Sequence, residues 1–329
     1  MESYYLFSNG DLKRKDNVVR LTRQDGKYKD LKIELTRDIF LFGEVSMNTK
    51  CLNFLSQNNI PLHLFNYYGY YTGSFYPREA NVSGKLLIRQ VAAQTDKKKR
   101  LELAQKFVQG AARNCYRNLS YYHGRHKDVG EAMNQMKALI KLIPRTNDVQ
   151  ELMGVEGNLH AIYYSAWPAI FNIDTGFTTR VRRPPDNMVN TLLSFLNMLT
   201  YSVCLSEIYV SQLNPTISYL HVPSERRFSL SLDISEIFKP LLVDRLIFTC
   251  VNKQIVTESD FENGSNNCYL KQGAQRKILE QFDQKLKQTI MYEPLGRNVS
   301  YRYLIRLECY KLIKDLLHDE PYKPFTMGW

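Results

Sequence analysis

Hydrophobic and polar residues alternate over short stretches in roughly the first 85 residues of the chain. Stretches of this kind, separated by turn dipeptides such as Asn9-Gly10, predict β-strands at 4–7, 17–21, 31–34, 39–42, 62–65 and 70–75. Segment 48–57 instead repeats its apolar residues Leu52 and Leu55 at helical spacing, and Asn58-Asn59 follows it as a stop signal. This part is therefore predicted to be a small β domain with one helix.

From about residue 85 the apolar residues recur with the period of a helix. The pattern predicts helices at 96–122, 128–142, 148–164, 186–211 and 234–252, and a β-hairpin between 255 and 270 around Asn263-Gly264. The predicted fold class is α+β, a small β-rich, sandwich-like domain followed by a larger all-α domain. The expected boundaries are 1–85 for the β domain, 86–97 for a linker, 98–320 for the helical domain and 321–329 for an aromatic tail.

The net charge of the chain indicates the kind of partner that it binds. The formal charge is +11, from 44 Lys plus Arg against 33 Asp plus Glu, which favours a polyanionic partner. Nucleic acid is the first candidate and an anionic membrane the second, although basic residues spread evenly for solubility explain the excess about as well.

Cysteine spacing and hydropathy limit where the protein works. The six cysteines contain no CxxC pair and no zinc-type spacing, which fits a reducing cytoplasm. The charges at Glu2 and from Asp11 to Lys15 break up any apolar stretch near the first residues, so we expect no secretion signal. The most apolar stretch, 192–210, is interrupted by Asn197 and Glu207, so we expect a buried core helix in a soluble protein and no membrane partner.

One candidate site residue is Glu156, which lies between Gly154 and Gly157 in a helical run that Asp148 can cap. Each glycine costs about 1 kcal/mol relative to alanine, which indicates close packing or close approach of a backbone or ligand. An exposed glutamate on a helix is the ordinary explanation.

The second candidate segment runs from His221 to Glu236. The histidine precedes a Pro-Ser loop, and a helix is expected to begin close to Asp233, which can cap it. Asp233 and Glu236 are three residues apart, so both acids can point to one side of that helix. Acids among the apolar residues found here are costly unless paired or bound to metal. A capping Asp, a solvated Glu and a satisfied His would also explain the spacing.

Two carboxylates and one imidazole would form an open site for Mg²⁺ or Mn²⁺, and the imidazole favours Mn²⁺ somewhat. Such a site suits phosphoryl transfer.

His160 follows Glu156 by one helical turn, and we interpret it as a satisfied core histidine. The basic residues expected to contact DNA are Arg226, Arg182, Arg183, Lys239 and Arg245. A solvated loop arginine explains Arg226 as well, and Arg182-Arg183 before Pro184-Pro185 could instead be a linker that starts the next helix. The tail residues Tyr322, Phe325 and Trp329 either dock on a partner or pack back on the helical domain.

Several blocks of residues, in order and spread over nearly the whole chain, resemble a known family. The blocks are Gly10 with Arg14-Lys15-Asp16-Asn17, Phe42-Gly43, Asn59-Ile60-Pro61-Leu62-His63, Gly154-Val155-Glu156-Gly157, Arg182-Arg183-Pro184-Pro185-Asp186 with Asn190 and Ser194-Phe195, and Tyr219-Leu220-His221 through Glu236-Ile237-Phe238-Lys239-Pro240. They resemble the universal CRISPR-associated integrase, which inserts new spacers, in its type I-B-like branch.

This resemblance implies a metal-dependent DNA integrase and endonuclease of CRISPR adaptation, which joins DNA by transesterification. It places Mg²⁺ or Mn²⁺ on Glu156, His221 and Glu236 as metal ligands and catalytic residues. Asp233 would be an auxiliary acid. Many relatives carry Asp at the last ligand position, so Glu236 would be a longer-armed substitute.

The resemblance also implies partners. It suggests double-stranded and branched DNA as substrates, a homodimer formed through the N-terminal domain, and a smaller adaptation protein flanked by two such dimers in a heterohexamer. Two other functions fit the residues. One is a stand-alone metal-dependent nuclease for branched-DNA repair, and the other is a non-catalytic nucleic-acid-binding scaffold whose acids are structural.

Overall fold

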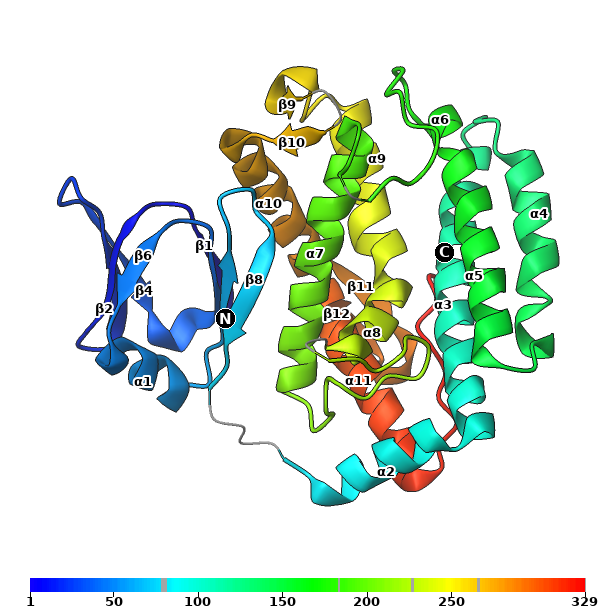
Figure 1. Ribbon diagram of the computed structural model, residues 1–329, viewed down its shortest axis with the longest axis horizontal. Helices are drawn as coiled ribbons and strands as arrows, with labels where there is room; N and C mark the ends of the chain where they lie inside the picture. Colours follow the sequence, from blue (N-terminus) through cyan, green and yellow to red (C-terminus); the bar gives the residue numbers. More distant parts are fainter. Residues whose placement is uncertain (78–81, 183, 226–227, 265–266, 329) are drawn as a thin grey trace. The chain divides into compact units, whose positions relative to one another are not determined.

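The computed structural model describes residues 1–77, 82–182, 184–225, 228–264 and 267–328 (Figure 1). The chain divides into two compact units, Met1–Asn81 and Val82–Trp329. Each unit is considered by itself below.

The described residues of the first unit form two four-stranded sheets, one α-helix and a short 3-10 turn, Ile33–Leu35. One sheet has the order β1 (Glu2–Leu6), β5 (Thr36–Leu41), β7 (Leu62–Phe65) and β8 (Tyr71–Phe75), with β1, β5 and β7 parallel and β8 antiparallel. The other has the order β4 (Tyr28–Lys32), β3 (Val18–Thr22), β2 (Gly10–Lys15) and β6 (Val45–Met47). Helix α1 (Thr49–Gln57) begins where the side chain of Asn48 accepts a hydrogen bond from the amide of Cys51.

Both sheets and α1 contribute to one hydrophobic core. Leu12, Leu31, Ile39, Leu62 and Leu55 are each 2% exposed or less in this shared cluster. Strands β2 and β6 were not predicted. In β2 only Leu12 is buried and most other residues are charged, so the alternation that marks a strand is weak there.

The second unit is mostly helical, which confirms the predicted α+β class. Its helices are α2 (Gly84–Thr95), α3 (Lys97–His123), α4 (Gly130–Ile140), α5 (Val149–Ser165), α6 (Trp167–Ile170), α7 (Met188–Tyr209), α8 (Ser229–Lys239), α9 (Arg245–Asn252), α10 (Gln272–Lys287) and α11 (Tyr301–His318). The described part of this unit also contains two hairpins, β9 (Phe261–Asn263) with β10 (Cys268–Leu270), as predicted, and β11 (Thr289–Tyr292) with β12 (Arg297–Ser300).

Helix α7 lies in the core of this unit. It is long and apolar enough to cross a membrane, but 78% of its most apolar window is buried inside the protein. The interrupting Glu207 is 1% exposed and binds Arg302 and Arg306 of α11 at 2.6 and 2.7 Å. A buried carboxylate needs partners of this kind, and here the protein supplies them. Since most of its apolar window is also buried, α7 is a core helix, as the sequence predicted.

Two boundaries differ from the sequence prediction. Residues 86–97, expected to be a linker, form α2 and the first residue of α3, because Leu86 and Ala93 pack into the second unit and the Gln90 side chain hydrogen-bonds the backbone of Asn214. The helix expected at 234–252 is interrupted by a π-helical turn, Pro240–Asp244, which separates α8 from α9.

The C-terminal tail packs back on its own unit. The Tyr322 hydroxyl donates to Glu308 at 2.5 Å, and the amide of Phe325 donates to the same carboxylate at 3.1 Å. The amide of Met327 donates to Asn114 of α3. Trp329 lies outside the described residues.

Candidate metal centre

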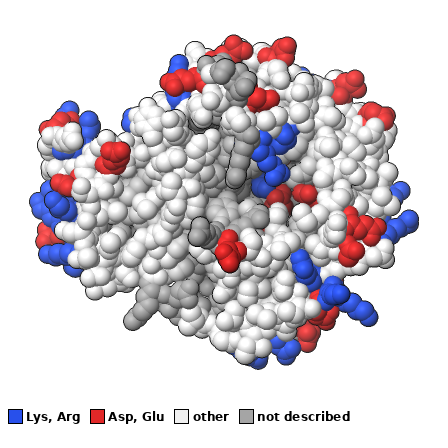
Figure 2. All heavy atoms as spheres, viewed as in Figure 1, with Lys and Arg blue, Asp and Glu red and all other residues white. Residues whose placement is uncertain are grey.

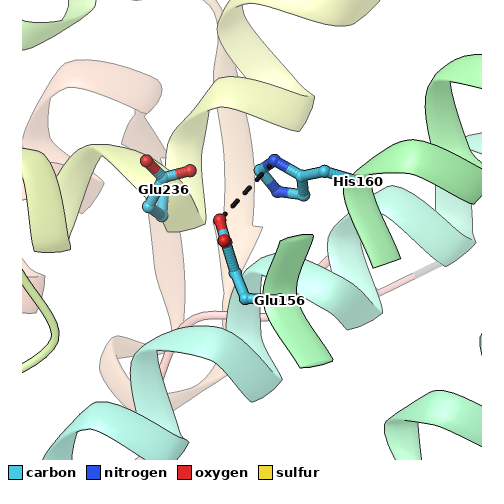
Figure 3. A group of neighbouring side chains, drawn as sticks. All are labelled: Glu156, His160 and Glu236. Carbon is cyan, nitrogen blue, oxygen red and sulfur yellow. Dashed lines mark ion pairs between the residues drawn. The ribbon is translucent and has the colours of Figure 1, made fainter. Parts of the chain in front are cut away.

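Three side chains from two helices converge in the second unit (Figure 3). Ligand atoms of Glu156, His160 and Glu236 all lie within 4.8 Å of one another, a group of metal-ligand type found among the described residues. Glu156 and His160 are one turn apart on α5, with 3.6 Å between His160 Nδ1 and Glu156 Oε1. Glu236 comes from α8. The helices bring together residues 80 positions apart in the chain.

Glu236 is the most constrained member of the group. Its residue is 7% exposed, and Oε1 forms an ion pair with Lys239. Burial by itself would raise the pKa of Glu236, but the positive charges of Lys239, His160 and His221 lower it to about 2. Within the described part of the chain, Glu236 Oε2 is buried with no hydrogen-bond partner. A buried, ionised carboxylate that keeps one oxygen without a partner, grouped with a second carboxylate and an imidazole, fits a divalent cation.

Asp233 has a different task from the one predicted. It does not cap α8, because that helix begins earlier, at Ser229, and Asp233 is fully buried within it. Its carboxylate accepts hydrogen bonds from the amides of Tyr219, Leu220 and His221 at 2.7 to 3.0 Å. Asp233 therefore fastens the loop before the helix to α8.

The same carboxylate orients His221. His221 Nδ1 lies 2.8 Å from Asp233 Oδ1, which leaves Nε2 as the ring nitrogen able to bind a metal. Burial lowers the pKa of His221, but the hydrogen bond to Asp233 and the charge of that carboxylate raise it by more. The net effect is a raised pKa. His221 is not a member of the three-residue group, although its charge acts on Glu236.

His160 lies in this group, where the sequence interpretation expected a satisfied core histidine. Its side chain is 24% exposed and faces Glu156. The four-residue spacing already placed it beside Glu156. Only the packing of α5 shows that this face of the helix looks toward Glu236.

The two glycines beside Glu156 do not serve packing inside the protein. A Cβ added at Gly154 or Gly157 would meet no atom within 4 Å. The sequence offered two explanations for these glycines. The open space excludes close packing and is compatible with the close approach of a ligand.

The predicted DNA-contacting residues fall into three groups. Lys239 is engaged with Glu236, and Arg245 donates to Asn118 at 2.8 Å, so both have structural partners near α8. Arg182 is exposed. Arg226 and Arg183 lie outside the described residues. On the face shown in Figure 2, basic and acidic side chains are interspersed, so this face does not present a uniform basic patch.

Another buried acid lies in the turn after α8. Asp244 is 3% exposed and accepts a hydrogen bond from the Tyr163 hydroxyl at 3.0 Å. Burial raises the pKa of Asp244 to about 7. No cation binds this carboxylate among the described residues, which explains why it holds its proton so much more strongly than Glu236 does.

Comparison with known proteins identifies the family. The family described as CRISPR associated protein Cas1 matches residues 4–284. A CRISPR-associated endonuclease Cas1 of Fusobacterium nucleatum is 52% identical over 99% of this chain and 97% of that protein. A Cas1 protein structure from Thermotoga maritima matches with a TM-score of 0.87 and 38% identity, over 100% of this chain and 99% of that one.

Two more distant structures share the fold alone. A casposase bound to integration product has a TM-score of 0.86 at 20% identity, covering 100% of this chain and 94% of that one. A Cas6-RT-Cas1–Cas2 complex has a TM-score of 0.85 at 18% identity, covering 99% of this chain and 36% of that one. The predicted enzyme class agrees with the endonuclease names of the close relatives. The full-length matches confirm the resemblance seen in the sequence, and the chain belongs to the Cas1 family of CRISPR-associated proteins.

Proposed function

We propose that this chain is a cytoplasmic, metal-dependent DNA integrase and endonuclease of CRISPR adaptation. Glu156, His221 and Glu236 would hold Mg²⁺ or Mn²⁺, as the family resemblance implies. The observation that carries the proposal is the buried carboxylate of Glu236, which is grouped with Glu156 and His160 and whose Oε2 has no hydrogen-bond partner among the described residues. Burying such an oxygen costs several kcal/mol unless a cation or donor fills the gap.

Each residue then has a defined task in strand transfer. A bound divalent metal would polarise the scissile phosphodiester and offset the charge that develops on its oxygens. Glu156 and Glu236 supply the two anionic ligands from separate helices, and Asp233 fixes the His221 ring so that Nε2 is presented. Lys239 neutralises part of the Glu236 charge, and its ammonium would also contact a phosphate of the bound DNA.

The reaction that fits this arrangement is a direct transesterification. The 3′-hydroxyl of a DNA fragment attacks a phosphodiester at the repeat, a new P–O bond forms, and the 3′-oxygen of the cut strand leaves with a proton. The same site would reverse the reaction on branched DNA, and water in place of the 3′-hydroxyl would give endonuclease cleavage. The casposase captured with its integration product, which shares this fold, agrees with strand transfer.

The proposed partners follow from the resemblance. Double-stranded and branched DNA would be the substrates, a homodimer would form through the N-terminal unit, and two dimers would flank a smaller Cas2-type protein. The net charge of +11 and the Cas1–Cas2 complex among the fold neighbours support this assembly.

Strand transfer on a branched DNA with Mn²⁺ or Mg²⁺ tests the proposal. Wild type should join strands, whereas His221→Ala and Glu236→Ala should not, and a chelator should stop the reaction. Glu280→Gln, which changes an exposed glutamate on α10, is the matched control and should behave as wild type. Cleaved fragments without joined strands would identify a stand-alone nuclease. Chelator-insensitive DNA binding with no products would identify a scaffold.

A further inference from the structure

His160 lies where a metal ligand would lie, although the family resemblance assigns it no role. It is a member of the three-residue group with Glu156 and Glu236, whereas His221 is not. We propose that His160 is a further ligand of the divalent metal, so that this centre combines two carboxylates with two imidazoles. The inference rests on the proposed metal site and concerns how that site is completed.

The spacing between the side chains is that of ligands to a common ion. His160 Nδ1 and Glu156 Oε1 are 3.6 Å apart, too far for a good hydrogen bond with each other. Ligands at about 2.1 Å from an octahedral metal are separated by about 3 Å when adjacent and by about 4.2 Å when opposite. The 4.8 Å limit on the group requires only a small closure to reach these values.

The surroundings of His160 restrain the imidazole ring through an aromatic contact. Its ring meets the edge of Tyr164 with centroids 5.8 Å apart, which restrains rotation. Its ring nitrogen belongs to the same group as the Glu236 carboxylate, whose Oε2 has no hydrogen-bond partner among the described residues. Glu156 and His160 also share one helix, which keeps the two residues one turn apart on the same face.

A second imidazole changes which metal the centre prefers. Mg²⁺ favours oxygen ligands and retains its waters, whereas transition metals gain more from imidazole nitrogen. The chain should therefore bind Mn²⁺ more tightly, relative to Mg²⁺, than a centre with one histidine would. Losing His160 should reduce this preference while leaving an oxygen-rich site that Mg²⁺ still occupies.

The test measures metal binding by the full-length protein without DNA. Pulsed electron paramagnetic resonance of Mn²⁺-loaded protein detects nitrogen nuclei bound to the ion, and titration gives the Mn²⁺ and Mg²⁺ dissociation constants. We expect two imidazoles in wild type and one in His160→Gln. The variant should bind Mn²⁺ about 10 to 100 times more weakly, with a Mg²⁺ affinity changed by less than about threefold. His318→Gln, which alters an exposed histidine outside the group, is the matched control.

The outcomes separate this inference from the proposed function. Glu236→Gln should abolish Mn²⁺ binding, and its failure to do so would remove the metal site altogether. If Glu236→Gln abolishes binding but His160→Gln leaves the nitrogen count unchanged, only the His160 assignment is overturned, even if affinity falls for structural reasons. Thermal unfolding of His160→Gln should match wild type, because its side chain is partly exposed.

Discussion

The two helices that form the candidate centre are held in very different ways. Helix α8 packs between α3 and α7, and both Asp233 and Glu236 on it are buried. Helix α5 contributes Glu156 and His160, whose side chains are each about one quarter exposed, next to glycines with open space around them. The α8 half is therefore preorganised by the core, and the α5 half is open to a substrate.

The same contrast separates the two acids of α8. Asp233 accepts three amide hydrogen bonds and one from His221, so its carboxylate is satisfied by the protein. Glu236, one turn later, keeps an oxygen without a partner. A buried acid that the fold satisfies is a structural group, whereas one that it leaves unsatisfied is suited to bind an ion.

The largest effect should come from the unsatisfied acid. Glu236→Gln keeps the side-chain volume but removes the charge that a cation needs, so strand transfer should fall at least a thousandfold, about 4 kcal/mol of barrier. Glu156→Gln should reduce strand transfer by a similar factor. Product formation on branched DNA measures the loss, with Glu280→Gln as control. Activity within tenfold of wild type would contradict the ligand assignment.

Asp233→Asn should mainly lower stability. The amide cannot accept all four hydrogen bonds, and its NH₂ group would face donors, so the free energy of unfolding should drop by about 3 kcal/mol. Chemical denaturation measures the change. Asp283→Asn, which breaks a surface pair with Lys287, should stay within about 0.5 kcal/mol. Equal losses in the two variants would mean that Asp233 does not fasten the loop to α8.

The sequence could predict those parts of the molecule that depend on local pattern. The change from strand to helical period, the Asp148 cap and the buried α7 all follow from spacing and residue type. The role of Asp233 depends on amides 12 to 14 residues earlier in the chain, which no local pattern places beside it. Phe228, which precedes α8, is not a capping residue, so the true start of that helix carried no signal.

His160 shows the same limit on the α5 side. Helical spacing placed it beside Glu156, but which face of α5 looks toward α8 is decided by packing between helices. The orphaned oxygen of Glu236 likewise results from the surroundings of the carboxylate and cannot be read from its neighbours in the chain.

A smaller effect is expected from Asp244, the buried acid with no cation. Its pKa rises from 3.8 to about 7 on folding, so the folded state binds an extra proton between these values and stability falls as pH rises. Between pH 5 and pH 7 the free energy of unfolding should fall by about 1 kcal/mol per pH unit from this group. Asp244→Asn can still accept from Tyr163 and should flatten the profile. An unchanged slope would show that another group titrates.

The smallest effect tests the open half of the centre. Because a Cβ at Gly157 meets nothing, Gly157→Ala should stabilise α5 by about 1 kcal/mol through its higher helix propensity. Denaturant unfolding without DNA measures the gain, and Gly154→Ala provides an independent repeat on the same helix. Gly110→Ala is the opposite control, because its Cβ would come within 2.7 Å of Pro324 and should destabilise the fold. A loss of stability in Gly157→Ala would mean that α5 is packed as tightly as α8, and the contrast between the two helices would not hold.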